Sequence, residues 1–87
     1  MARYRVLSWR GIPAQIRAQD EDGRVTVAMP DRFQQEIDRI AMRHGLADSD
    51  AYLEGWTWSS DVERPGSAAD VAAMVVDELI AAREREA

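Results

Sequence analysis

The stretch IPAQIRAQDEDGRVTVAM, residues 12–29, decides the predicted fold. Every second residue is apolar on both sides of its acidic DEDG segment, which is the pattern of two half-buried strands. The Asp22-Gly23 pair is typical of a type I′ hairpin turn, and such a turn places Ala18 opposite Val27. The turn and the alternation therefore agree on one buried face of an antiparallel hairpin.

The segments before and after this hairpin extend the pattern. Residues 3–10 are rich in β-forming side chains and predict a further strand, so the first three strands form a meander. After the hairpin, apolar residues at helical spacing predict a helix from Asp31 to His44, with Asp31 and Gln34 as its capping box. Gly45 then supplies the left-handed residue that commonly ends a helix.

The last part of the chain predicts a linker, a strand and a second helix. Residues 46–52 are polar and turn-like, whereas residues 56–62 alternate in the manner of a fourth strand. Ser67 and Asp70 have the spacing of a second capping box, and the helix that they open should run to about Arg85.

These elements predict a single α+β domain over residues 1–87, in the order β-β-β-α-β-α. We expect a two-layer sandwich, in which a three-stranded antiparallel meander and a fourth strand carry two helices on one face. The third strand, the first helix and the fourth strand form a crossover unit. For such a unit the right-handed rule places the fourth strand parallel beside the first, in the sheet order 3-2-1-4.

Composition excludes several kinds of protein. The 87 residues include no cysteine, which rules out disulfides, thiolate catalysis and cysteine-based metal sites. The longest apolar run, residues 71–76, is far shorter than the roughly 18 residues that mark a membrane span. Arginine supplies every basic residue, which is typical of a high-GC bacterium. We therefore expect a bacterial cytoplasmic protein without a membrane partner.

No catalytic or cofactor motif stands out. The single histidine, His44, sits where the carboxyl end of a helix favours a protonated imidazole, and a metal site with Asp48 and Asp50 would have no recognisable spacing. The serines have no neighbouring nucleophile motif, and the isolated glycines match neither the Walker nor the Rossmann pattern. We expect no catalytic residue, no metal and no cofactor.

Charge argues against nucleic acid as a partner. The chain carries a net charge of −5, although its first 19 residues hold four arginines and no acidic residue. The alternative is that basic and aromatic residues near the start of the chain stack single-stranded bases on a sheet face. These residues are Arg3, Arg5, Arg10, Tyr4 and Trp9.

The three tryptophans allow two interpretations, as part of the core or as a binding site. Trp56 and Trp58 would meet Trp9 if the first and fourth strands are neighbours. One interpretation is that the three build the core of a small domain. The other is that they form a recognition patch with Arg10, because tryptophan and arginine are enriched at binding hot spots. We expect at least one of Trp56 and Trp58 in the core, and Trp9 partly exposed.

The last helix carries a second candidate surface. Val76 and Ile80 belong to an apolar row beside the main stripe, so the apolar face is wider than one sheet contact needs. In one interpretation the first helix covers this row, and in the other a homodimer or a partner interface uses it.

Two segments resemble a known family. They are YRVLSWRGIPAQI, residues 4–16, and YLEGWTW, residues 52–58, and they resemble the small bacterial domain catalogued as "virulence factor", which is also found in conserved virulence factor C. The resemblance implies an accessory module and supplies no catalytic residue. It also implies relatives that stand alone or are joined to scaffold-like and helical-repeat segments, sometimes near corrinoid methyl-transfer genes.

We therefore expect a non-catalytic accessory or protein-interaction domain that binds a protein partner or a second copy of itself. One alternative is a small-molecule or cofactor-binding module with the tryptophans as walls, and another is a subunit of a larger methyl-transfer enzyme system. A deep apolar pocket would favour the binding module, and a flat exposed patch would favour docking. The candidate contact residues are Trp9, Arg10, Trp56, Trp58, Val76 and Ile80.

Overall fold

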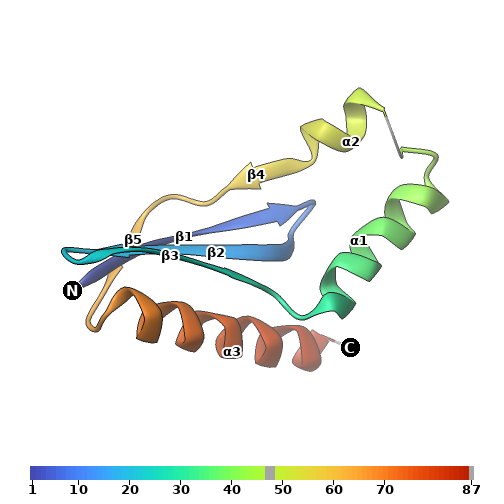
Figure 1. Ribbon diagram of the computed structural model, residues 1–87. Coiled ribbons are helices and arrows are strands. Elements are labelled where there is room, and N and C mark those ends of the chain that lie inside the picture. Colours follow the sequence, from blue (N-terminus) through green and yellow to red (C-terminus); the bar gives the residue numbers. More distant parts are fainter. Residues whose placement is uncertain (47–48, 87) are drawn as a thin grey trace.

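The computed structural model describes residues 1–46 and 49–86 of the chain. Its elements are, in chain order, β1 (Ala2–Trp9), β2 (Ile12–Asp20), β3 (Gly23–Ala28), α1 (Asp31–Arg43), α2 (Asp50–Glu54), β4 (Trp56–Trp58), β5 (Val62–Arg64) and α3 (Ala68–Glu86). Figure 1 shows α3 along one face of the sheet, α2 on the side of the other face and α1 at one end of the strands. The α+β class and the four predicted strand regions are confirmed, and α2 is an additional element.

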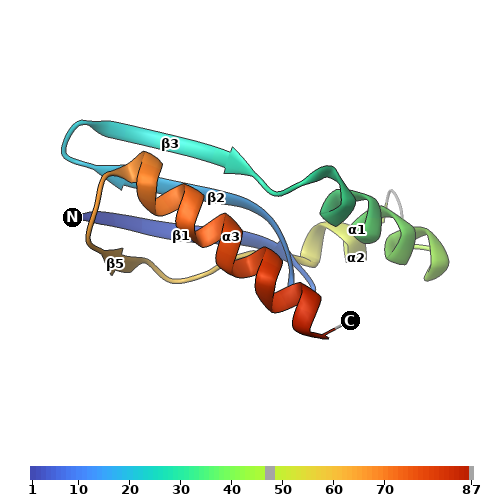
Figure 2. The same ribbon diagram turned by 90° about the horizontal axis from the view of Figure 1, so that it is seen from below.

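The sheet has the predicted order β3-β2-β1-β4, but β4 runs antiparallel to β1, so the predicted parallel direction is wrong. The chain leaves β3 at the end of the sheet where β1 also ends, and α1 and α2 stay at that end (Figure 2). The next strand must therefore start there and run back along β1. The right-handed rule describes parallel crossovers, in which a helix returns the chain to the opposite end of the sheet.

The predicted fourth strand is divided into two short strands on the same edge. β4 pairs with the end of β1, and β5 pairs with its beginning. Between them, the N–H of Ser59 donates a hydrogen bond to the Val6 carbonyl oxygen, and Ser59 Oγ accepts one from the Val6 N–H, both at 2.9 Å. Ser59 thus keeps the interrupted segment beside β1.

Apolar side chains from the strands meet α3 on one face of the sheet. Val6 lies opposite Ile16, and Ile16 lies opposite Val27, so the three side chains share this face. On α3, Val71 and Val75 are buried against them. This packing forms the main core of the domain.

The first helix packs at the end of the sheet and does not lie beside α3 across the strands (Figure 2). Its buried side chains are Phe33, Ile37 and Ala41, which extend the core past the ends of the strands. The ion pairs Arg32–Glu84 and Arg83–Glu36 join α1 to the last turns of α3.

The turn between β2 and β3 differs from the predicted type I′ turn. Glu21 and Asp22 form its loop, and Asp20 Oδ1 accepts a hydrogen bond from the Asp22 N–H at 2.8 Å. The pairing consequently shifts by two residues, and Ala18 lies opposite Val25. A shift of two keeps every side chain on its own face, so the predicted buried face is confirmed.

The type I′ backbone occurs in the other hairpin, between β1 and β2. Arg10 has a φ of 48° and Gly11 a φ of 87°, the signs that a type I′ turn requires. A non-glycine residue in this region is uncommon. The Arg10 N–H donates a hydrogen bond to the Gly55 carbonyl oxygen at 3.2 Å, so the segment after α2 supports this turn.

The start of α3 has two caps from different parts of the chain. Ser67 Oγ accepts a hydrogen bond from the Asp70 N–H at 3.1 Å, which confirms half of the predicted capping box. Asp20 Oδ2 accepts a second one from the Ala68 N–H at 2.7 Å. One carboxylate therefore holds both the β2–β3 turn and the beginning of the last helix.

The predicted capping box of the first helix is wrong. The helix begins directly after Pro30, which offers no side-chain acceptor, and Asp31 lies in its first turn. At the other end Gly45 has the expected left-handed backbone, with a φ of 66°. The predicted linker also contains α2, where Ser49 Oγ caps the helix by accepting a hydrogen bond from the Tyr52 N–H.

Trp9 is completely buried, which corrects the expectation that it stays partly exposed. Its Nε1 donates a hydrogen bond to the Tyr52 carbonyl oxygen at 2.8 Å, and the centroids of the two rings lie 5.7 Å apart. A Cβ atom at Gly55 would lie 2.5 Å from Trp9 Nε1, so this position has no room for a side chain. Trp9 thus joins β1 to α2 and to the start of β4.

Gly55→Ala should lower the free energy of unfolding by about 1–3 kcal/mol, the usual cost of overpacking a close-packed core. Gly55 has helical backbone angles, so the backbone preference of alanine does not explain such a loss. Urea unfolding measures the change. In a Trp9→Phe background the same substitution should cost less, because phenylalanine has no Nε1 at the point of contact. An equal cost in both backgrounds would contradict this packing.

Asp20→Asn should lower the melting temperature at neutral pH more than Asp22→Asn does, because Asp20 caps both the turn and α3. The Ala68 N–H, followed by the Asp22 N–H, lowers the pKa of Asp20 in the folded protein. Such a carboxylate stabilises fully above its ordinary pKa of about 4 and loses this effect as the pH falls through the lower folded pKa.

Melting curves at neutral pH and at several values below about pH 4 measure this dependence. The gap between the wild type and Asp20→Asn should shrink as the pH falls. A gap that stays constant into strong acid would show that the charge of Asp20 contributes nothing.

Candidate functional site

The face of the sheet opposite α3 carries a group of arginines. Arg5 of β1 lies opposite Arg17 of β2. In the neighbouring row Arg3 lies opposite Gln19, which lies opposite Arg24 of β3. Paired residues on neighbouring strands point to the same side of a sheet. The register therefore gathers four arginines from three strands on one surface.

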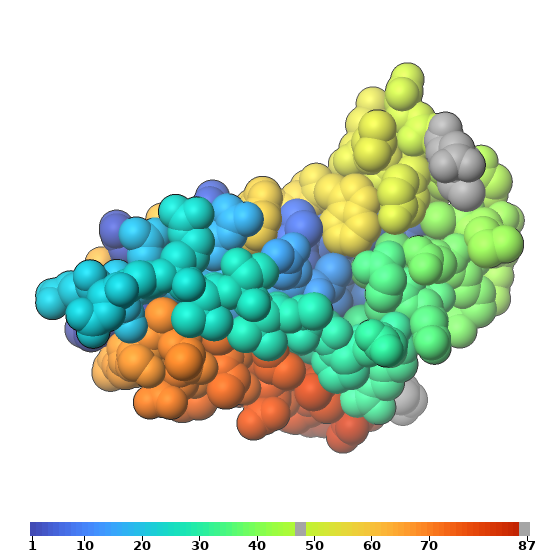
Figure 3. Space-filling view, viewed as in Figure 1, coloured from blue at the N-terminus to red at the C-terminus, as the bar shows by residue number. Residues whose placement is uncertain are grey.

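These arginines line a shallow pocket of about 110 Å³. On the same side of the sheet, α2 rises at one end of the strands (Figures 1 and 3). The pocket is lined by Arg3, Arg5, Arg17, Gln19, Arg24 and Asp61. We call the surface made by the four arginines and the adjacent Trp58 the arginine face.

Trp58 positions two of these arginines. The Cζ atom of Arg5 lies 5.1 Å from the centroid of the Trp58 ring, and that of Arg17 lies 4.8 Å from it. Such cation–π contacts hold a guanidinium group in place without neutralising its charge. Trp58 is 38% exposed, so its ring is part of the surface that a partner would meet.

Two acidic side chains accompany the arginine face: Glu63 of β5 lies opposite Arg3, and Asp61 lies beside Arg5. Within the described parts of the chain its one ion pair joins Arg5 Nε to Asp61 Oδ1 at 3.4 Å. Arg17 Nε is buried and has no hydrogen-bond partner among those same residues. A chain with a net charge of −5 thus concentrates positive charge on one small surface, which favours the binding of an anion.

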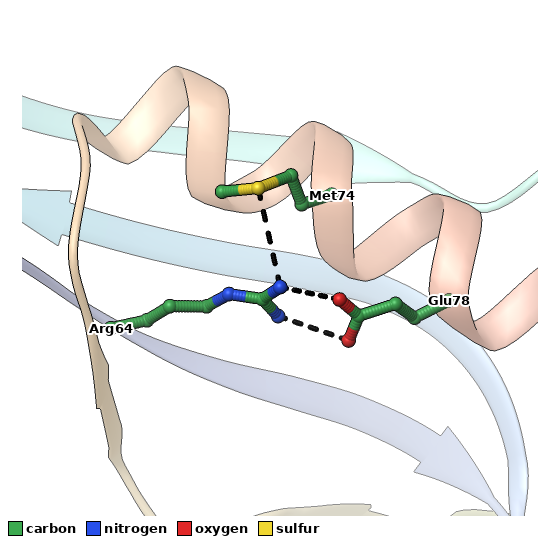
Figure 4. Close-up of polar contacts among 3 residues, drawn as sticks. All are labelled: Arg64, Met74 and Glu78. Carbon is green, nitrogen blue, oxygen red and sulfur yellow. Dashed lines mark hydrogen bonds and ion pairs between the residues drawn. The ribbon is translucent and has the colours of Figure 1, made fainter.

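Arg64, on the α3 side of the sheet, has the more usual arrangement. Its Nη1 donates a hydrogen bond to Glu78 Oε1 at 2.9 Å, its Nη2 donates one to Glu78 Oε2, and Nη2 also lies 4.0 Å from the sulfur of Met74 (Figure 4). The hydrogen bonds from Arg64 lower the pKa of Glu78. One carboxylate therefore binds one guanidinium group here, and this ion pair connects β5 to α3.

Of the four predicted contact residues around the tryptophans, Trp9, Arg10 and Trp56 lie together at the β1–β2 turn, and Trp58 lies farther along β4. Trp9 is core, and Arg10 is exposed at the β1–β2 turn, with its Cζ atom 5.1 Å from the centroid of the Trp9 ring. Trp56 lies opposite Trp9 and packs edge-on against the Tyr52 ring, with centroids 6.1 Å apart. Neither Trp56 nor Trp58 is fully buried, and Trp56 packs against the core as a partly buried side chain, because Trp9 takes the fully buried position. Trp58 alone of the four reaches the arginine face.

Val76 and Ile80 lie on α3, away from the arginine face. Both are partly buried and pack against the main core. Part of the additional apolar row is therefore used within the chain, and its use in a homodimer stays a prediction.

Sequence reasoning missed Arg17 and Arg24 as site residues. Arg17 stands between two apolar residues of a predicted strand, and Arg24 stands directly before the apolar Val25, so each alternates with the buried face and points outward. The signal that could have found them is the register of the three strands, which brings both beside Arg3 and Arg5.

The hypothetical metal site has no support here. His44 is exposed at the end of α1, and Asp48 lies outside the described residues. In the described ranges, no group of three or more histidine, cysteine, aspartate or glutamate side chains could hold a metal ion. No helix in those ranges is long and apolar enough to cross a membrane.

Comparison with known proteins identifies a family for this chain. No curated protein and no solved structure matches the chain. A family model described as "Virulence factor" matches residues 7–87, a span that includes Trp9, Arg17 and Trp58 but not Arg3 and Arg5. Because this match covers nearly the whole chain, the protein belongs to the Virulence factor family.

Proposed function

We propose that the domain is a non-catalytic accessory module that binds an acidic segment of a protein partner on the arginine face. The observation that carries the proposal is the gathering of four arginines beside the exposed Trp58. Arginine and tryptophan are among the residue types most enriched at binding hot spots. Guanidinium groups form strong, charge-assisted hydrogen bonds with carboxylates, so an acidic segment complements this surface.

Charge favours a protein segment over nucleic acid. The chain has a net charge of −5, so most of its surface repels a long polyanion, whose many phosphates extend beyond a small basic face. A short acidic peptide needs to contact only the arginine face.

The shape of the pocket favours docking over the enclosure of a cofactor. Sites for drug-sized ligands usually measure about 300–1,000 Å³ and are mostly apolar. The pocket on the arginine face measures about 110 Å³, and its lining is charged apart from one glutamine amide. The cofactor-binding module and the subunit of a methyl-transfer system stay predictions without a structural argument.

Arg17→Gln and Arg24→Gln should each weaken the binding of a fluorescein-labelled oligoglutamate peptide by about tenfold, the effect of losing one charge-assisted hydrogen bond. Fluorescence anisotropy at low salt measures the dissociation constants, and added salt should weaken binding because it screens exposed charges. Arg39→Gln, the same substitution on the exposed side of α1, is the matched control and should leave binding unchanged.

Two results would count against the proposal. Equal weakening by Arg39→Gln would mean that the peptide follows overall charge and has no defined site. Tighter binding of a single-stranded oligonucleotide than of the peptide, with the same dependence on Arg17, would assign the face to nucleic acid.

A further inference from the structure

The arginine face offers more donors than an ordinary acidic side chain can use. The chain's own Arg64–Glu78 pair shows that both oxygens of one carboxylate are taken by one guanidinium group (Figure 4). The pocket collects four guanidinium groups, and its own carboxylate, Asp61, reaches Arg5 from one side at 3.4 Å. Even with Asp61 and with Glu63 opposite Arg3, a single carboxylate from a partner would leave positive charge on this surface.

We infer that this pocket is a subsite for a phosphate group, carried by a phosphorylated side chain within the acidic segment of the partner. The inference rests on the proposed function and specifies its ligand. A phosphate monoester has a charge of about −1.5 to −2 and three acceptor oxygens. Planar guanidinium groups bind such oxygens in pairs of parallel hydrogen bonds. Its charge and its number of acceptors fit a ring of arginines better than a carboxylate does.

The arginines are already positioned for such a ligand. Trp58 lies against the guanidinium groups of both Arg5 and Arg17, 5.1 and 4.8 Å from the ring centroid. The Nε atom of the stacked Arg17 is buried and has no hydrogen-bond partner among the described residues, so this donor is not used within the domain. Arg3 and Arg24 flank Gln19 in the neighbouring row. Groups held in place before binding lose little conformational freedom when the ligand arrives.

The pocket also suits the size of the group. Its volume of about 110 Å³ is well below that of a drug-sized site and fits one small charged group at the tip of a side chain. Asp61 shares the pocket and carries the same sign of charge as phosphate. It competes for Arg5, so Asp61 must move away from Arg5 or weaken the binding of the phosphate.

Three versions of one acidic peptide test the inference, with serine, glutamate or phosphoserine at the central position. The phosphoserine peptide should bind the wild type at least about tenfold more tightly than the glutamate peptide, by anisotropy. Arg3→Gln and Arg17→Gln should reduce this ratio to near one, whereas the control Arg39→Gln should keep it. Asp61→Asn should raise the affinity for the phosphoserine peptide severalfold, and this gain cannot arise from misfolding.

Each outcome separates the two proposals. If the glutamate and phosphoserine peptides bind equally and both depend on Arg17, the phosphate subsite is overturned and the proposed function stands. If no peptide binds, the proposed function fails, and the subsite fails with it. If inorganic phosphate binds as tightly as the phosphoserine peptide, the pocket is a site for the free ion and the inference about a phosphorylated partner is wrong.

Discussion

The hydrogen bond from Trp9 Nε1 to the Tyr52 carbonyl oxygen fixes how the two halves of the chain meet. It lies inside a packed contact in which the indole is fully buried and Gly55 is too close to carry a side chain. Removing a buried tryptophan typically costs about 3–5 kcal/mol, a large share of the stability of so small a domain. Because β4 begins directly after Gly55, this contact also sets where the returning strand joins β1.

The same contact decides which part of the sheet stays uncovered. α2 is tied to the end of β1 through Trp9, and α3 occupies the opposite face, so no described helix lies over the middle of the strands on the side of α2 (Figure 1). Burying arginine under another helix would require a carboxylate or equivalent partner for each, because an unpaired buried charge is strongly unfavourable. The chain leaves these groups at the surface and supports two of them with the Trp58 ring, which makes this face available to an anionic partner.

Local patterns predicted much of the fold, and their failures have physical causes. The alternation around Ile16 identified two strands and their buried face, because the side-chain period of a strand is a local property. The predicted type I′ turn occurs in the other hairpin. Asp20 supplies a side-chain acceptor to the β2–β3 turn, whereas Arg10 at the β1–β2 turn adopts positive φ with support from Gly55. The direction of β4 depends on the end of the sheet at which the chain emerges from α1 and α2. The arginine face arises only when strands from distant parts of the sequence, including that of Trp58, are placed in register.

A titration of the ¹⁵N-labelled protein with the phosphoserine peptide, followed by two-dimensional NMR, tests the binding surface most directly. We expect saturable shifts of the side-chain N–H signals on the arginine face, while the backbone signals of α1 stay in place. Shifts centred on Arg32 and Arg39 at the α1 end, or shifts that do not saturate, would contradict it. The reporting groups on the arginine face are the Nε–H of Arg3, Arg5, Arg17 and Arg24 and the indole N–H of Trp58.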